Sequence, residues 1–254
     1  MNIHRLFPAL ALCSVLASPA MASAVVAQDN FNSYANGALT SANGGTGWAG
    51  AWTSSSSVAV ADGSLSLFGS GDNSVASRKL ASAITGNVLI SFDFTLDAGS
   101  LQTNDFLALW FGSSTGPNIG LKANCGSNCS NDLFVRTGGT DAGGNAQNVV
   151  QDTTYSMLGY LQKTSGSSVY NRFDLWINPT AAEVSSLTGS DAFDLGDANI
   201  SSFDTIGFRR ANLDSGDVVT IDNLRVSAVP EPGSLALLGS GLALMLATAR
   251  RRMR

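Results

Sequence analysis

Apolar and polar residues alternate along much of the chain. The clearest alternation covers residues 88–97, where one parity is apolar (Val88, Ile90, Phe92, Phe94, Leu96) and the other mostly polar (Leu89, Ser91, Asp93, Thr95, Asp97). A period of two is typical of a β-strand with one buried and one solvated face. Residues 106–111 (Phe-Leu-Ala-Leu-Trp-Phe) are apolar on both parities. This pattern predicts a central strand that is covered on each side.

Weaker patterns predict further strands at residues 65–68, 133–137, 146–150, 155–163, 172–177, 205–209 and 218–226. Turns rich in Gly, Ser, Asn and Asp separate them, and amphipathic helices are almost absent. About ten strands of this kind predict an all-β fold, a two-sheet antiparallel β-sandwich. The single helical candidate follows Pro179, where Thr180 and Glu183 have the spacing of a capping box.

The last strand contains an irregularity. Under strict alternation Ile221, Leu224 and Val226 cannot share one face. A strand that buries all three side chains must gain one residue, so we expect a bulge or twist at Asp222 and Asn223.

Both ends of the chain have the composition of delivery signals. Residues 1–24 combine a basic start, an apolar run and small residues at a cleavage position, which predicts a secretory signal peptide. Near the other end, residues 234–249 are uncharged and mostly apolar, and arginines follow. As a helix this run spans roughly 24 Å, somewhat short of a ~30 Å hydrocarbon core. Flanking arginines favour the cytoplasmic side, so the residues before Pro230 are expected outside the cytoplasm.

Residues 229–254 resemble the PEP-CTERM family of bacterial sorting signals. The resemblance rests on a Pro-Glu-Pro triplet, a short transmembrane helix and a basic end, carried here by Pro230, Glu231, Pro232, Arg250, Arg251 and Arg252. It implies a Gram-negative host, a transient anchor in the inner membrane, processing by an exosortase-type membrane protease, and display at the cell surface or release. An ordinary C-terminal tail anchor would give the same topology without processing.

Between the two signals, residues 25–228 form one domain of a size that suits a β-sandwich. This region holds nine Lys and Arg against 18 Asp and Glu, a formal charge of −9. Nucleic acid and anionic membrane surfaces are therefore poor partners for the domain as a whole. Its two cysteines, Cys125 and Cys129, lie in a turn-rich stretch and predict a small disulfide-closed loop in an oxidising compartment. Zinc is the alternative, but two thiols supply half a site.

The composition argues against catalysis. Glu183, the one glutamate in residues 25–228, is assigned to a helix cap, and the only histidine, His4, belongs to the signal peptide. Retaining glycosidases need a pair of positioned carboxylates, and serine or cysteine nucleophiles need a base. The sequence therefore predicts a protein that is not an enzyme, although a site built only of aspartates stays open.

Two stretches resemble the concanavalin A-like lectin and glucanase superfamily of jelly-roll sandwiches. Residues 29–37, with 44–48, are similar to the first strand and loop of such modules, and residues 221–226 to their last strand. The resemblance implies that the first and last strands lie together, and that one structural Ca²⁺ is held near Asp29 and Asp222. The alternative is that both aspartates cap strand ends.

Carbohydrate association is the function that the sequence favours. Sugars are bound by aromatic faces together with carboxylate and amide groups. Trp176 shares a parity with Asp174 and is the first candidate platform; Trp48 and Trp52, in a Gly-rich loop, are the others. Each of these tryptophans could instead plug the core. We therefore expect an exported, non-catalytic protein that associates with polysaccharide, with a ligand-free matrix component as the alternative.

Overall fold

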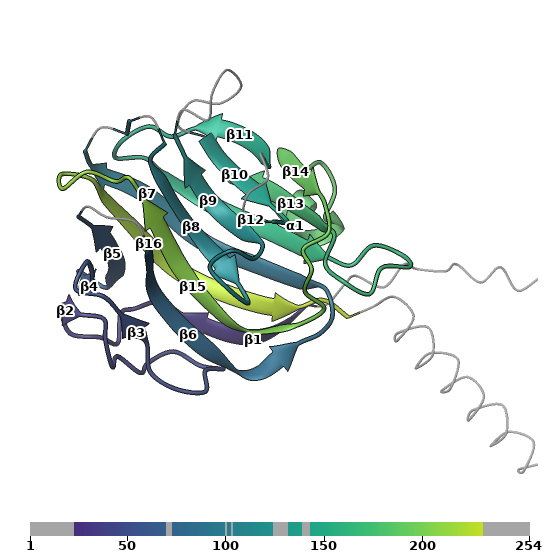
Figure 1. Ribbon diagram of the computed structural model, residues 1–254, viewed down its shortest axis with the longest axis horizontal. Helices are drawn as coiled ribbons and strands as arrows, with labels where there is room; N and C mark the ends of the chain where they lie inside the picture. The colour runs from purple at the N-terminus through teal and green to yellow at the C-terminus, as the bar shows by residue number, and fades with distance from the viewer. Residues whose placement is uncertain are drawn as a thin grey trace, which may run out of the picture.

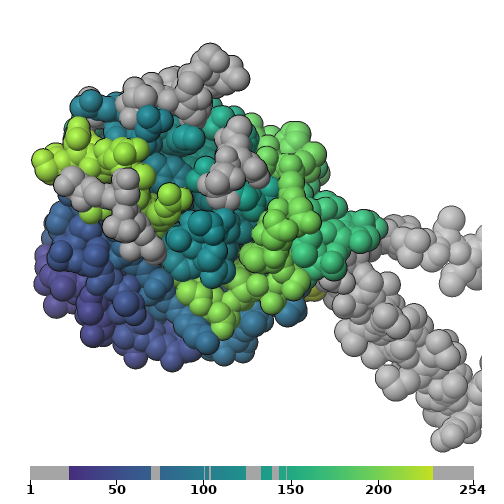
Figure 2. Space-filling view, in the orientation of Figure 1, coloured from purple at the N-terminus to yellow at the C-terminus, as the bar shows by residue number. Residues whose placement is uncertain are grey.

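The computed structural model describes residues 23–69, 73–99, 101–102, 104–123, 132–138 and 143–230. These residues form two antiparallel sheets packed face to face, with one short helix, α1 (Ala181–Ser186), at one end (Figure 1). The predicted all-β sandwich is therefore confirmed. Figure 2 shows the purple and blue N-terminal segments at one side of the molecule and green segments that follow β12 at the other.

The larger sheet has nine strands. Its order is β14 (Ala192–Leu195), β13 (Arg172–Ile177), β12 (Thr154–Gln162), β7 (Val88–Ala98), β16 (Val218–Ala228), β5 (Ser64–Phe68), β4 (Val58–Ala61) and β2 (Gly37–Ala38), with β1 (Ala24–Asp29) also paired to β16. The seven-stranded sheet has the order β11 (Gly144–Asn148), β10 (Asp132–Arg136), β9 (Asn118–Lys122), β8 (Phe106–Phe111), β15 (Phe203–Ala211), β6 (Asn73–Ile84) and β3 (Thr53–Ser54).

The hydrophobic pattern determines which faces meet. On β7 every residue of the apolar parity is buried between the sheets, whereas the other parity is only partly covered. All six residues of β8 are buried, as the doubly apolar pattern predicted. Its outer residues Phe106 and Ala108 are covered by a small cluster with Phe134, so the two faces of this strand pack in separate clusters.

The helix predicted after Pro179 and the bulge predicted at Asp222 and Asn223 are confirmed. Thr180 and Glu183 form a complete capping box at the start of α1. In β16 the register to β7 shifts between Asp222 and Arg225, and Asn223 has a φ of 52°. This bulge allows Ile221, Leu224 and Val226 all to be buried.

Several strands were not predicted. The described residues contain 16 strands, whereas the pattern predicted about ten. The largest omission is β6, whose sequence Asn-Ser-Val-Ala-Ser-Arg-Lys-Leu-Ala-Ser-Ala-Ile is poor in the aromatic and β-branched residues that mark strands. The first strand was also misplaced, because β1 ends at Asp29 and does not begin there.

The first and last strands lie together, as the family resemblance implied. Ala24 of β1 faces Ala228 of β16, and the pairing continues to Asp29 and Leu224. The described chain therefore begins and ends side by side at one end of the sandwich (Figure 1).

Candidate functional site

A buried ion pair joins the two sheets near the start of the chain. Asp29, at the end of β1, accepts a 2.8 Å hydrogen bond at Oδ2 from Nη1 of Arg78 on β6, and both side chains are almost fully buried. The Asp29 carboxylate also accepts from the Phe31 amide, the Tyr34 hydroxyl and Trp52 Nε1. Burial and the neighbouring Asp29 carboxylate raise the pKa of Tyr34, which keeps its hydroxyl a donor.

The Gly-rich loop closes over the arginine of this pair. Arg78 donates through Nε to the Gly50 carbonyl at 2.7 Å and through Nη2 to Asn43 Oδ1 at 2.8 Å. Its guanidinium carbon lies 4.9 Å from the ring centroid of Trp48 and 5.6 Å from that of Trp52. Such cation–π contacts stabilise a guanidinium most where it is desolvated.

Through these contacts three of the candidate residues, Asp29, Trp48 and Trp52, pack into or against the core. Trp52 is 2% exposed, and Trp48 is partly buried, with its Nε1 donating to the Gln28 carbonyl. Asp29 does not fit a calcium ion, because its charge is already balanced by Arg78 and its oxygens already accept from four groups. Among the described residues no group of three or more His, Cys, Asp or Glu is arranged to hold a metal.

Trp176 and Asp174, the other carbohydrate candidates, are covered as well. Trp176 is 1% exposed beneath Leu187 and donates to the Thr188 carbonyl, so its ring has no open face. Asp174 is 3% exposed and forms an ion pair with Arg172. The chain that follows α1 provides this cover, which the strand alternation did not reveal.

The outer face of the nine-stranded sheet carries a different polar site, which we call the acidic groove. It is an open hollow of about 450 Å³ across β12, β7, β16 and the start of β5, lined by Ser64, Asp93, Thr95, Asp97, Asp152, Thr154, Thr220 and Asp222. All eight lining residues carry a carboxylate or a hydroxyl, and none is aromatic or basic.

Strand register brings these side chains together. Thr95 of β7 faces Thr154 of β12 on one side and Thr220 of β16 on the other. The hydroxyls of Thr95 and Thr154 lie 2.9 Å apart. Asp93 faces Asp222 across the β7–β16 pair. Asp93, Thr95 and Asp97 alternate with the apolar residues of one strand, so the sequence predicted that they face solvent. Their partners in the acidic groove come from segments far away in the chain.

The two facing carboxylates of the acidic groove differ in their surroundings. Asp93 accepts from the Ser156 hydroxyl at 2.7 Å and from Asn223 Nδ2 at 2.8 Å. Burial raises the pKa of Asp222, and the nearby charges of Asp93 and Asp29 raise it further, against the hydrogen bond from the Asn223 amide. A raised pKa means that Asp222 takes up a proton more readily than an ordinary aspartate, and a protonated carboxyl can donate a hydrogen bond where an ionised one only accepts.

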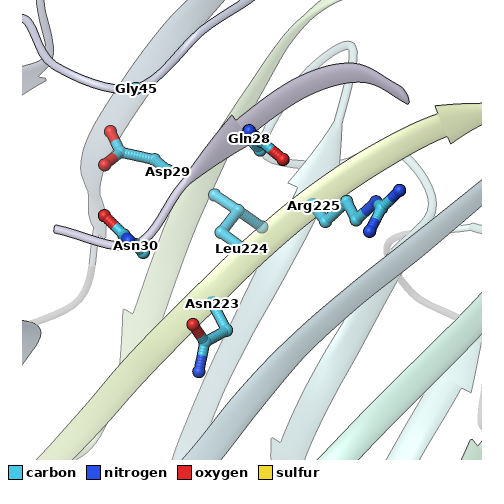
Figure 3. A pocket seen from close by; sticks show the side chains of 7 residues that line it. All are labelled: Gln28, Asp29, Asn30, Gly45, Asn223, Leu224 and Arg225. Carbon is cyan, nitrogen blue, oxygen red and sulfur yellow. The ribbon is translucent and has the colours of Figure 1, made fainter.

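A smaller hollow of about 290 Å³ lies at the bulge of β16. Its lining includes Asn30, Gly45 and Asn223, and Asn223 follows Asp222 of the acidic groove directly. Figure 3 shows Asn30 beside Asp29 below Gly45, and Arg225 of β16 also lines this hollow. Asn223 connects the two hollows, because it lines this one and donates through Nδ2 to Asp93 of the acidic groove.

The opposite sheet carries a hollow of opposite charge. It measures about 360 Å³ and is lined in part by Phe106, Lys122, Arg136 and Arg209. The guanidinium carbon of Arg136 lies 5.0 Å from the ring centroid of Phe106, and that of Arg209 lies 5.4 Å from it. Burial lowers the pKa of Lys122, and the charge of Arg136 lowers it further. We call this the basic hollow; it is the second surface that could hold a ligand.

The remaining candidates lie outside the described residues. These are Cys125 and Cys129, most of the signal peptide, and the sorting residues after Pro230. No helix within the described part of the chain is long and apolar enough to cross a membrane.

Comparison with known proteins identifies the C-terminal signal and the fold. Residues 228–252 match the PEP-CTERM protein-sorting motif, which indicates export with processing by a membrane-anchored exosortase. No curated protein matches the chain.

Similar solved structures include the alginate lyase Aly36B, with a TM-score of 0.51 and 14% identity over 82% of this chain and 100% of that one. The exoplasmic/lumenal domain of VIP36 in its Ca²⁺/Man3GlcNAc-bound form has a TM-score of 0.51 and 12% identity over 71% of this chain and 84% of that one. The chain therefore shares the β-sandwich fold of these two proteins. Since both binding proteins and polysaccharide-cleaving enzymes have it, the fold alone does not assign an activity.

The buried ion pair predicts a large stability effect. Replacing Asp29 by alanine leaves the Arg78 guanidinium buried without its counter-charge, so we expect the free energy of unfolding to fall by about 3–5 kcal/mol in urea denaturation. The matched control is Asp204→Ala. It breaks the exposed ion pair between Asp204 and Lys79, the residue that follows Arg78. Exposed pairs contribute little, so this variant should unfold close to the parent. Equal losses in the two variants would contradict the role given to Asp29.

Because the pKa of Asp222 is raised, replacing this residue by asparagine should raise the thermal stability by an amount that depends on pH. Because the folded protein holds this proton more tightly than the unfolded chain does, ionisation of Asp222 lowers stability as the pH rises through its raised pKa. We expect Asp222→Asn to melt above the parent at pH 7, and the difference to vanish below about pH 3, where both states are protonated. Lys79 lowers the pKa of Asp204, so Asp204→Asn should show the opposite sign at pH 7. Thermal melts from pH 3 to 8 would test this, and a pH-independent difference would contradict it.

Proposed function

We propose that the chain, once exported through its PEP-CTERM signal, binds uncharged polysaccharide in the acidic groove without cleaving it. The observation that carries this proposal is the lining of the groove, which consists entirely of carboxylates and hydroxyls. Sugar hydroxyls donate to carboxylates and both donate to and accept from Ser and Thr, so every lining residue can contact a glycan. The binding would place the protein in the polysaccharide at the cell surface or outside the cell.

The charge of the groove selects among polysaccharides. Four aspartates line it and no lining residue is basic. Their summed negative potential repels uronate, sulfate and phosphate groups, more strongly at low ionic strength. A neutral glucan, mannan or xylan avoids this repulsion, and the open shape of the groove suits a chain better than a small enclosed ligand.

The hydrogen-bond pattern supports binding over catalysis. Asp93, which faces Asp222, is held by Ser156 and Asn223, so both of its oxygens already accept a hydrogen bond. No histidine, glutamate, arginine or lysine lines the groove to move a proton or stabilise a developing charge. Calcium is not needed at Asp29, where Arg78 supplies the positive charge.

A second candidate function is cleavage of polysaccharide by an aspartate pair. The facing carboxylates of Asp93 and Asp222, with the pKa of Asp222 raised, are the observation that favours it. A protonated and an ionised carboxyl flanking one glycosidic bond are the groups that hydrolysis requires. This candidate predicts release of reducing ends that Asp222→Asn abolishes.

The test is glycan binding by the full chain in detergent, measured by calorimetry with glucan, mannan, xylan and alginate. The double variant Thr95→Val and Thr220→Val keeps the β-branched shape and removes two hydroxyls from the groove. At about 1 kcal/mol for each hydrogen bond, affinity for the neutral glycan should fall roughly 10- to 30-fold.

Thr205→Val, on the other sheet, is the matched control and should bind as the parent does. Tighter binding of alginate than of any neutral glycan would overturn the proposal, as would equal affinity in the groove and control variants. Absence of binding to the whole panel would leave a purely structural matrix role.

A further inference from the structure

A second part of the outer face of the nine-stranded sheet is apolar. A groove of about 490 Å³, here called the α1 groove, lies beside α1 and is lined by Leu89, Pro179, Ala181, Val184, Leu187, Val229 and two serines. No lining residue is charged, and Val184 is 46% exposed. Leu158, Tyr160 and Trp176 form the apolar layer on which Leu89 and Leu187 pack.

The α1 groove lies where both ends of the domain leave the sandwich. Val229 lines the groove and follows Ala228, which is paired with Ala24 of β1; Ser23 and Ala24 are the last two residues of the predicted signal peptide, so the mature domain begins at the same place. The amide of Val229 donates to the Asn87 carbonyl at 2.9 Å, which holds the exit point of the C-terminal tail against the domain. The position of the tail's first residue is therefore set by the fold.

The distance from this exit to the apolar run of the tail is short. Four residues, Pro230 to Gly233, separate Val229 from Ser234, the first residue of the uncharged run. Fully extended, this tether reaches roughly 18 Å. While residues 234–249 are in the bilayer, the end of the domain that carries the α1 groove cannot move farther from the hydrocarbon boundary than the tether allows.

The charge around the α1 groove allows this end of the domain to approach the membrane surface. The domain as a whole is acidic and is repelled by anionic lipid. The α1 groove itself presents no carboxylate. The one acidic residue of α1, Glu183, is tied to the start of the helix by the amide and hydroxyl of Thr180, and these hydrogen bonds lower its pKa and keep it ionised. An apolar groove with one carboxylate on its helix can enter the headgroup region against less repulsion than the acidic domain as a whole meets.

We propose that the α1 groove contacts the boundary between headgroups and acyl chains while the chain is still anchored by its tail. The contact orients the unprocessed protein with the ends of β1 and β16 toward the membrane. Asp222 precedes Val229 by seven residues along β16, so the acidic groove is held roughly 20 Å farther out. This inference depends on the sorting tail and is independent of the proposed carbohydrate binding.

The contact is tested by fluorescence quenching of the full chain in phosphatidylcholine–phosphatidylglycerol vesicles. The lipid carries bromine near the headgroup end of its acyl chains. The variant Val184→Trp places a reporter in the groove, and Ser215→Trp is the matched control in an exposed turn beyond the opposite end of the 11-residue strand β16. After subtraction of the native tryptophans, we expect at least threefold greater quenching of Val184→Trp. Equal quenching of the two reporters would overturn the proposal.

A second reporter distinguishes contact of the α1 groove with the lipid from mere proximity of the domain to the bilayer. Ser185→Trp should lose most of its quenching when it is combined with Val184→Asp, because a charge at the groove opposes entry into the headgroup region. Unchanged quenching would mean that only the tether holds the domain near the bilayer, and would overturn the proposal. If another copy of the chain or the tail itself covers the groove, Ser185→Trp is shielded from lipid in both backgrounds, which also overturns it. Near-ultraviolet circular dichroism verifies that each variant is folded.

Discussion

The ion pair between Asp29 and Arg78 is the interaction on which the rest of this structure depends. Asp29 ends a strand of the nine-stranded sheet and Arg78 belongs to the seven-stranded sheet, so one buried contact joins both layers. The Gly-rich loop and its tryptophans pack around the arginine. By holding β1 in place, the pair keeps the first strand on the last and brings both chain ends to one side.

The strand held in this way, β16, organises the outer face of its sheet. Its first half contributes Thr220 and Asp222 to the acidic groove, and the bulge then turns the chain so that core side chains stay buried. The strand's last residue precedes Val229, which lines the α1 groove. One strand thus links a polar surface suited to a glycan with an apolar surface beside the sorting signal, and its length separates the two.

The sequence predicted those structural features that are determined within one segment of the chain, and missed those that depend on distant partners. The strand at 88–97, the covered strand at 106–111, the capping box and the bulge are consequences of spacing within one segment, and all are confirmed. The strand β6 lacked a local signal because most of its side chains are small or charged. The place of Asp29 could not be derived, since its partner lies 49 residues away. Trp176 is buried beneath the chain that follows α1. Thr220 joins the acidic groove through strand register, and Asp152 joins it from the turn before β12.

The most direct test of the proposed glycan binding is nuclear magnetic resonance of the isotope-labelled chain in detergent, titrated with a neutral oligosaccharide. Binding in the acidic groove predicts amide shift changes concentrated on the strands that form it, at Asp93, Thr95 and Thr220. Changes concentrated instead at Lys122 and Arg209 of the basic hollow, or at Trp48 in the Gly-rich loop, would contradict it.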